Sequence, residues 1–415
     1  MYGLVDGNNF FVSCERVIDP RLEGRAVAVL SNNDGCCVSR SNEFKAKGIA
    51  MGTPYFQLRD REATGELVFR SSNYELYGDL SRRIVSILRE DAVEVEQYSI
   101  DEAFVKPPDG RDLAAWGAAL RDKILRWVGV PCGVGFAPTK TLAKIANHIA
   151  KKRPEGVYVL EDDPTAILAA LPVDEVWGVG RRLSAKLRTE RIFTALDLRD
   201  AERDCVRAIG GVTLLRTAME LAGTSCTEER AYDADPDSVS CSRSFGEPVT
   251  TEAALSESIA AFTAQGAVKL RKHGLVAAGA NIYAQYGTAC AHDWTARTVV
   301  FPQPTDATNE MLAALRPFLG ALFIPGVRYR KSGMVFFGIE KAGAARQGDL
   351  FLDAQSAPTE KSRLYAAVDA LNSRFGRGSV FSAAEGLPGA RTWTMKRSML
   401  SRRATTNWDE LIRVK

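Results

Sequence analysis

The sequence is poor in the residues that build zinc sites and disulfide frameworks. Its eight cysteines are scattered, no two of them in C-x-x-C spacing, and none of its three histidines stands at ligand spacing from a cysteine. Structural zinc sites draw on closely spaced Cys and His ligands, so we expect none here. Scattered free thiols are typical of a reducing compartment, which favours the cytosol.

Long apolar runs and a strong charge of one sign are also missing. No window approaches the about 20 uninterrupted apolar residues that span a bilayer, and Asp6 breaks the N-terminal apolar run. We therefore expect a cytoplasmic protein with no membrane segment. The formal net charge is only +3, so any surface that binds nucleic acid must be local. Residues 391–415 hold seven Lys/Arg against two Asp/Glu.

The order of apolar patterns predicts several domains, because 415 residues exceed one ordinary core of about 150 residues. Strand-like and helix-like stretches alternate over the first 165 residues, which indicates a mixed α/β domain. Short helical elements follow over residues 172–224, then an acidic, polar stretch that we interpret as a linker. Further strand-like runs surround a predicted helix at residues 255–270.

Four predicted elements of the first domain bear on the site. Residues 2–5 form a short apolar run that predicts a buried strand, and residues 93–105 look extended. Residues 72–75 have the spacing of a capping box, which predicts the start of a helix with Leu76 and Leu80 on its buried face. A second helix is expected over residues 113–127.

Acidic residues stand in two of these apolar strands. Asp6 ends the first strand, and Asp101 and Glu102 lie inside the otherwise apolar residues 98–104. Burying an unpaired carboxylate is costly, so such residues indicate a bound cation. Mg²⁺ prefers carboxylate oxygens together with substrate phosphates, and two ions about 4 Å apart support phosphoryl transfer. Without further information the alternative stays open, since Asp at a strand end commonly shapes a turn and an Asp-Glu pair is commonly solvated.

A family resemblance favours the metal interpretation. Residues 1–15 (MYGLVDGNNFFVSCE) and 98–104 (YSIDEAF) are similar to the two palm motifs of Y-family DNA polymerases. Residues 30–35, 71–77, 172–182, 240–247 and 395–400, with the tail at 408–415, resemble the UmuC-type branch in particular. The resemblance runs from end to end. It implies error-prone translesion DNA synthesis in the SOS response and DNA repair, by template-directed, two-metal-ion nucleotidyl transfer from a dNTP to a primer 3′-hydroxyl.

The resemblance also implies a fold, a multidomain α/β (α+β) right-hand polymerase. The implied domains are a palm at 1–30 and 72–165, small fingers at 31–71, a helical thumb with a helix-hairpin-helix at 166–230, a linker at 231–239, a little finger at 240–342, a flexible segment with a clamp-binding peptide at 343–360, and a UmuC-type C-terminal region at 361–415.

Site residues follow from the matched motifs. The resemblance implies that Asp6, Asp101 and Glu102, with the Gly7 carbonyl, hold two Mg²⁺ ions. Phe11 matches the steric gate, a ring below the sugar that collides with a ribose 2′-hydroxyl. Residues matched to the triphosphate site are Arg40, Lys45 and Lys151. The chain departs from relatives here: Phe11 stands where Tyr is frequent, and Lys45 replaces an Arg that could bind phosphate in a bidentate way, with Asn42 in place of Tyr.

Contacts with DNA and proteins are implied in the same way. Gly178, Gly180 and Arg181 belong to the hairpin that would bind a phosphate at a helix N-terminus. In the little finger, Arg243 and Arg330 are candidate contacts to the DNA backbone, which carry no sequence information and so suit any template. The clamp-binding peptide includes Gln347, Leu350 and Phe351, with Gly348 in place of the usual apolar residue. The implied partners are primer-template DNA, dNTPs, a processed UmuD-like dimer, RecA and a sliding clamp, at the nucleoid.

Three other functions are weaker interpretations. A nucleotide cyclase would use the same metal chemistry, but it would not need the Gly-x-Gly hairpin of residues 178–180 or a full C-terminal domain. A non-catalytic DNA-binding subunit would not need three intact carboxylates. A glycosidase using Asp101 and Glu102 is opposed by their adjacency, because neighbours in a strand point to opposite faces.

Overall fold

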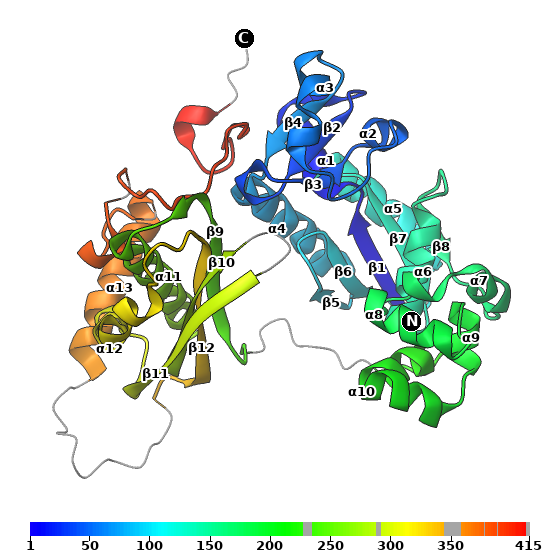
Figure 1. Cartoon of the computed structure of the whole chain (residues 1–415). Helices are drawn as coiled ribbons and strands as arrows, with labels where there is room; N and C mark the ends of the chain where they lie inside the picture. The colour runs from blue at the N-terminus through cyan, green and yellow to red at the C-terminus, as the bar shows by residue number, and fades with distance from the viewer. Residues whose placement is uncertain (227–234, 288–291, 344–357, 377, 388, 412–415) are drawn as a thin grey trace. The chain divides into compact units, whose positions relative to one another are not determined.

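A computed structural model describes residues 1–226, 235–287, 292–343, 358–376, 378–387 and 389–411 (Figure 1). The chain divides into two compact units. One holds Met1–Ser31, Gly35–Ala234 and Met399–Lys415, and the other holds Asn32–Asp34 and Asp235–Ser398. The last residues of the chain therefore belong with its first half.

The first unit is built on a five-stranded sheet in the order β5-β6-β1-β7-β8. Its strands are β1 (Tyr2–Gly7), β5 (Glu94–Gln97), β6 (Glu102–Lys106), β7 (Cys132–Ala137) and β8 (Val157–Val159). The central strand, β1, is antiparallel to both β6 and β7. This central position explains the apolar sequence of β1, which is buried on both faces.

Helices cover both faces of this sheet (Figure 1). Leu4 and Phe104 pack in the same core as α6 (Lys140–Ala150), whereas Val5 and Val105 pack in a second core. The helices of this second core are α1 (Phe10–Ile18), α4 (Tyr74–Asp91) and α5 (Leu113–Val128). A Cβ on Gly135 would lie 2.1 Å from the backbone nitrogen of Asn147, so only glycine lets α6 approach the sheet this closely.

A three-stranded sheet in the order β3-β2-β4 forms a smaller layer of the first unit. Its elements are β2 (Val27–Leu30), β3 (Cys37–Arg40), α2 (Asn42–Ala46), α3 (Arg59–Ala63) and β4 (Val68–Ser71). Phe44 and Phe69 fill a separate small core here. Because β2 pairs with both other strands, this layer begins before residue 31, the expected boundary of the fingers.

Short helices follow the five-stranded sheet, as the sequence predicted for residues 172–224. They are α7 (Thr165–Ala170), α8 (Arg181–Thr189), α9 (Ala195–Asp200) and α10 (Arg203–Leu221). Leu187, Leu198 and Leu214 of these helices pack in the same core as Leu142 of α6. The helical region is thereby fixed to the face of the sheet that carries Leu4.

The second unit is a four-stranded antiparallel sheet with helices against it. Its strands, in the order β11-β10-β12-β9, are β9 (Val239–Val249), β10 (Leu275–Gly287), β11 (His292–Thr305) and β12 (Tyr329–Lys341). Its helices are α11 (Glu252–Lys272), α12 (Thr308–Leu319) and α13 (Pro358–Phe375). Phe262 of α11 and Phe336 of β12 meet in its core. Arg271 ties α13 to α11 through Asp369, at 2.7 Å.

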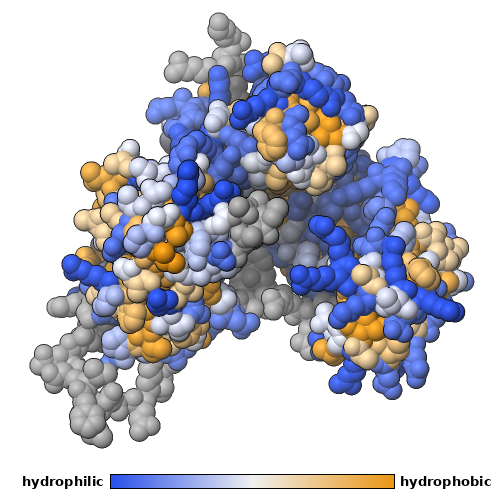
Figure 2. All heavy atoms as spheres, viewed as in Figure 1, coloured by the Kyte–Doolittle hydropathy of each residue, from blue (hydrophilic) through white to orange (hydrophobic). Residues whose placement is uncertain are grey.

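Single 3₁₀ turns complete the described secondary structure. They are η1 (Pro20–Leu22), η2 (Asn32–Asp34), η3 (Tyr55–Gln57), η4 (Val173–Glu175), η5 (Gly320–Leu322), η6 (Ala383–Glu385) and η7 (Trp408–Glu410). On the face drawn in Figure 2, hydrophobic atoms form separate patches among hydrophilic residues, as is ordinary for folded proteins. None of the helices in the described ranges is both long and apolar enough to cross a membrane.

Two local expectations were wrong. Residues 93–105 are not one extended stretch but a hairpin of β5 and β6, because Ser99 accepts hydrogen bonds from the backbone nitrogens of Asp101 and Glu102 and so closes a turn. The helix α4 is capped by Asn73 rather than by Ser72: the Asn73 side chain accepts from the third residue of the helix at 3.3 Å.

Candidate active site

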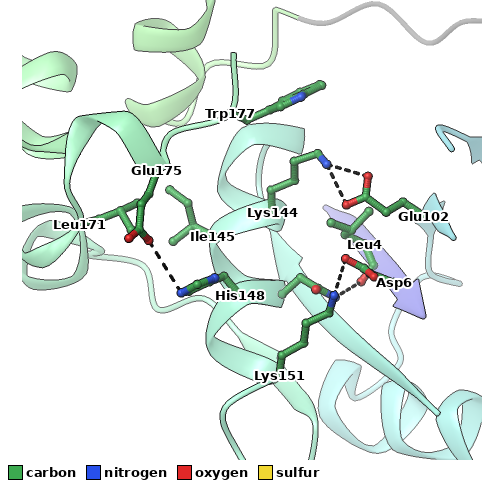
Figure 3. Close-up of a pocket in the computed structure, with 11 residues that line it drawn as sticks. Leu4, Asp6, Glu102, Lys144, Ile145, His148, Lys151, Leu171, Glu175 and Trp177 are labelled. Carbon is green, nitrogen blue, oxygen red and sulfur yellow. Dashed lines mark hydrogen bonds and ion pairs between the residues drawn. The ribbon is translucent and has the colours of Figure 1, made fainter. Parts of the chain in front are cut away.

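Two of the three expected carboxylates face each other across neighbouring strands. Asp6 near the end of β1 is paired in register with Glu102 at the start of β6. Directly opposed residues of an antiparallel pair share a face of the sheet. Leu4 shares this face too, since it lies two residues before Asp6. Asp6 and Glu102 therefore project to the side on which α6 packs (Figure 3).

A lysine within α6 and the lysine that caps its C-terminus neutralise the two carboxylates. The Lys151 ammonium lies 2.6 Å from Oδ2 of Asp6, and the Lys144 ammonium lies 3.0 and 2.9 Å from the two carboxylate oxygens of Glu102 (Figure 3). Residues seven positions apart lie on one side of a helix, which lets both lysines reach this edge of the sheet. Lys140 differs, because it is only 1% exposed and pairs with Glu96.

Burial and the negative charges of neighbouring carboxylates destabilise the ionised form of Asp6, so a cation at this edge of the sheet is stabilising. The pKa of Asp6 is raised to about 6, chiefly by burial and also by the negative charges of Glu102 and Asp101, against the opposing effect of Lys151. Each carboxylate therefore gains from a positive charge placed beside it. In this structure the lysine ammonium groups supply that charge.

Asp101 is close to this pair but is held by a different partner. It lies in the turn before β6, and its side chain accepts a hydrogen bond from Ser99 at 2.6 Å. Among the residues that the structure describes, no three His, Cys, Asp or Glu side chains surround one point as metal ligands would. The three carboxylates are thus neighbours that do not converge while lysines and serine hold them.

These residues fit a hard divalent cation better than zinc. The three carboxylates offer oxygen ligands, and Mg²⁺ typically takes a few carboxylates and completes its shell with water and substrate phosphates. The side chain of Asp6 is 14% exposed, and its pKa is raised first by burial and then by two neighbouring carboxylates, which is the electrostatic setting that a bound cation relieves. The donor set is therefore suitable for divalent metal, as expected from the sequence.

A pocket of about 300 Å³ opens beside the carboxylates, lined in part by Lys144, Lys151 and Trp177. The Lys144 ammonium lies 4.5 Å from the ring centre of Tyr98 and 5.3 Å from that of Trp177. Trp177 in turn donates a hydrogen bond to the Tyr98 hydroxyl at 3.2 Å. Lys144 is therefore held by two aromatic faces as well as by Glu102. Figure 3 shows Trp177 and Glu102 beside it. This arrangement cannot be predicted from the sequence, since neither Tyr98 nor Trp177 has a spacing that signals it.

The expected triphosphate residues form a group of mutually repelling cations. The pKa of Lys45 is lowered, first by burial and then by the positive charges of Arg40 and Lys151. Lys45 donates to the side chain of Asn9 at 2.6 Å, and Asn9 donates to Asn42 at 3.1 Å. Such a group favours an anion in its midst. Asn42 thus has a partner of its own.

Phe11 lies in the first turn of α1, where its ring stacks on Tyr77 of α4. The ring centres are 4.5 Å apart and the planes differ by 13°. Tyr74 contacts the same ring edge-on at 6.3 Å. Phe11 is therefore not simply a core residue beside Phe10. One face of its ring packs on Tyr77, and the side chain stays half-exposed.

The residues expected to contact DNA lie around the start of α8 and in two strands of the second unit. Gly178 has φ +88°, a left-handed conformation that glycine adopts without strain, and Gly180 precedes α8 as its N-cap. Arg181 begins this helix and is exposed. Arg243 in β9 and Arg330 in β12 are exposed in the second unit. Gln347, Leu350 and Phe351 lie outside the described residues.

The fold matches solved polymerases. A Y-family DNA polymerase chimera of Dbh and Dpo4 superposes with a TM-score of 0.65 at 20% identity, over 82% of this chain and 99% of that one. A ternary insertion complex of Dbh DNA polymerase gives a TM-score of 0.56 at 19% identity, with the same coverage. The architecture is that of a right-hand polymerase, as expected.

Sequence relatives make the assignment specific. Models of the impB/mucB/samB family and of its C-terminal domain match residues 5–148 and 236–350, and a domain of unknown function matches 362–414. Protein UmuC of Salmonella typhimurium is 39% identical over the whole of both chains, and protein MucB of Escherichia coli is 35% identical over 98% of each. DNA polymerase IV 1 of Bacillus subtilis is 28% identical over 90% of each.

These matches place the chain among DNA-directed DNA polymerases of the Y family, which use divalent metal ions, and confirm the resemblance inferred from its motifs. The chain belongs to the impB/mucB/samB family and is similar to UmuC over its full length. Its activity is error-prone translesion DNA synthesis on primer-template DNA with dNTPs.

Proposed function

We propose that the primer is extended at the edge of the five-stranded sheet, where Asp6, Asp101 and Glu102, together with the Gly7 carbonyl, hold two Mg²⁺ ions. The observation that carries this proposal is the in-register pair of Asp6 and Glu102, each compensated by a lysine. When bound, the ions would activate the primer 3′-hydroxyl and stabilise the leaving pyrophosphate oxygen.

The lysines would have to release the carboxylates in the working enzyme. Lys151 is one-third exposed and ends a flexible side chain, so its ammonium is free to turn from Asp6 to the triphosphate. There it joins Arg40 and Lys45, whose mutual repulsion an incoming triphosphate relieves. As the α-phosphate accepts the primer oxygen and the bond to pyrophosphate breaks, these cations oppose the charge that collects on the leaving group.

We further propose that Phe11 selects the sugar of the incoming nucleotide. Phe11 lies in the first turn of α1, four residues after Gly7, and its ring rests on Tyr77. A 2′-hydroxyl placed above the ring would overlap it, whereas a deoxyribose would not. The absence of a phenolic hydroxyl leaves this selection to shape alone.

We also propose contacts with DNA and with protein partners. The hairpin at Gly178 and Gly180 with Arg181, together with Arg243 and Arg330, would contact DNA phosphates, because exposed arginines and backbone N–H groups suit a sequence-independent grip. A processed UmuD-like dimer, RecA and a sliding clamp are the proposed protein partners, at the cytoplasmic nucleoid. Support for them is the likeness to UmuC along the whole chain.

A primer-extension assay tests the catalytic assignment. Purified protein with its accessory partners and clamp is given a primed template, dNTPs and Mg²⁺, and Asp101→Asn should abolish extension while template binding, measured by fluorescence anisotropy, is kept. Asp109→Asn is the matched control, since Asp109 is exposed in a loop near the same strand. Extension by Asp101→Asn at the wild-type rate would contradict the carboxylate assignment, and no extension by the wild type would contradict the proposed chemistry.

A further inference from the structure

A second buried carboxyl group lies in α1, away from the proposed metal ligands. Glu15 is completely buried, and its Oε1 atom accepts hydrogen bonds from the Tyr77 hydroxyl at 2.6 Å and from the Ser401 hydroxyl at 3.1 Å. The other oxygen, Oε2, is buried with no hydrogen-bond partner in the described part of the chain. Burying an acidic group costs free energy, so a buried glutamate at this position indicates a specific role in the surrounding structure.

The hydroxyl of Tyr77 connects Glu15 to the proposed sugar gate. One end of Tyr77 is fixed by the hydrogen bond to Glu15, while the face of its ring stacks on Phe11 with centres 4.5 Å apart. Tyr77 itself is completely buried. A ring anchored at its hydroxyl cannot slide along its neighbour, so it gives Phe11 a fixed surface to rest on.

Residues 399–401, here called the C-terminal segment, complete this network of hydrogen bonds. Ser401 lies 386 residues after Glu15, and neighbouring bonds hold it in place. Ser71 and Met399 exchange two hydrogen bonds of 3.0 and 2.9 Å, and the Asn73 side chain donates to Ser401 at 2.9 Å. Asn73 also caps α4, the helix that carries Tyr77. The segment thus supports both the start of that helix and the carboxyl that anchors its tyrosine.

We propose that Glu15, Tyr77 and Ser401 are positioning residues that fix the ring of Phe11 and so set how strongly ribonucleotides are rejected. This rests on the proposed role of Phe11 as the gate. A steric gate rejects a 2′-hydroxyl only if the ring cannot retreat, and close packing behind the ring prevents retreat. The C-terminal segment is therefore part of the apparatus for sugar selection, although it is remote in sequence from every nucleotide contact.

The measurement that tests this is the ratio of kcat/KM for a dNTP to that for the matching ribonucleotide, taken in single-nucleotide insertion with the complete enzyme. This ratio does not change if a variant is merely less well folded, because both substrates see the same active fraction. Tyr77→Phe keeps the stacked ring and removes only its anchor, so we expect the ratio to fall about fivefold, the factor equivalent to one ordinary hydrogen bond. Ser401→Ala should lower it by about two- to threefold, since Tyr77 still binds Glu15.

Two further variants distinguish a positioning role from a general loss of structure. Glu15→Gln keeps an oxygen that can accept from Tyr77 and Ser401, so its ratio should stay within about twofold of wild type, as expected for a conservative rescue. Tyr55→Phe is the matched control: it also removes a hydrogen bond from a tyrosine to a glutamate, Glu62, but the Tyr55 ring packs on Phe69, with centres 5.1 Å apart. Its ratio should equal that of wild type.

Phe11→Ala distinguishes failure of this inference from failure of the gate. If Phe11→Ala leaves the ratio unchanged, Phe11 is not the gate, and both proposals are overturned. If Phe11→Ala lowers the ratio but Tyr77→Phe and Ser401→Ala behave like Tyr55→Phe, the gate stands and the positioning network is overturned. A graded fall, largest for Phe11→Ala, then Tyr77→Phe, then Ser401→Ala, supports the network.

Discussion

Two carboxyl groups nine residues apart in the sequence occupy contrasting surroundings. Asp6 lies at the edge of a pocket and is bonded to the ammonium of Lys151, whereas Glu15 lies under α4 and is bonded to the hydroxyls of Tyr77 and Ser401. Burial raises the pKa of both groups. The two sites therefore share a desolvation cost and differ in what offsets it.

The difference lies in how exchangeable the partner is. An ammonium on a long, partly exposed side chain can leave Asp6 when another cation arrives, at little cost in packing. The hydroxyls around Glu15 belong to buried or half-buried residues, so their exchange would require unpacking two helices and the C-terminal segment. Asp6 is thus suited to binding a changing set of cations, and Glu15 to holding neighbours in place.

The sharpest test of this contrast replaces each carboxylate by its amide. Asp6→Asn should reduce single-nucleotide insertion by about 10³-fold or more, because charge on this group is required to hold metal at the reacting phosphate. Glu15→Gln should leave kcat/KM for dNTPs within about twofold, since its task needs only a hydrogen-bond acceptor. Rapid-quench insertion kinetics measure both. Equal losses in the two variants would remove the distinction between them.

Lys140 and Lys151 offer a second comparison, between a buried lysine in an ion pair and a partly exposed lysine whose place another cation can take. Lys140→Met should lower the free energy of unfolding by roughly 3 kcal/mol, because Lys140 is 1% exposed and its loss strands the charge of Glu96. Lys151→Met should lower it by less than about 1 kcal/mol, since Lys151 is one-third exposed, but it should raise KM for dNTPs. Urea denaturation and steady-state kinetics give the two quantities. A larger stability loss for Lys151→Met would reverse the assignment.

Much of the candidate active site could be predicted from local sequence, because strand periodicity and two acidic motifs are local signals. Asp6 and Glu102 stand opposite each other as a buried central strand and its neighbour require. The hairpin turn at Ser99 was missed, since its hydrogen bonds depend on one side-chain hydroxyl within an apparently continuous strand. The bond of Lys144 to Glu102 could not be predicted either, because it depends on how closely α6 approaches the sheet at Gly135.

The Glu15 network could not be predicted from one sequence. Glu15 is a single glutamate in a helix, where a solvated position is the ordinary expectation, and nothing local marks it as buried. Its partners come from α4 and from the C-terminal segment, and only the folded chain brings these together. Local patterns identify chemistry that is concentrated in motifs, whereas contacts across several hundred residues carry no periodic signal.

The smallest expected effect is a dependence on pH that belongs to Glu15 alone. Its pKa in the folded protein is raised above the ordinary value of 4.5, chiefly by burial, so the folded state holds the proton more strongly than the unfolded state does. The resulting stabilisation is complete below the unfolded pKa and is lost as pH rises through the folded pKa. Glu15→Gln cannot titrate and does not suffer this loss.

The free energy of unfolding of Glu15→Gln minus that of wild type should therefore increase from pH 4.5 upward and level off once Glu15 is ionised in both states. Urea denaturation of both proteins at half-unit steps from pH 4.5 to 8 measures this difference, in which the titration of all other groups cancels. Glu161→Gln, at an exposed loop position, should give a difference that does not change with pH. A flat difference for Glu15→Gln as well would mean that Glu15 is ionised as readily in the folded chain as in water, and its hydroxyl partners would then offset burial completely.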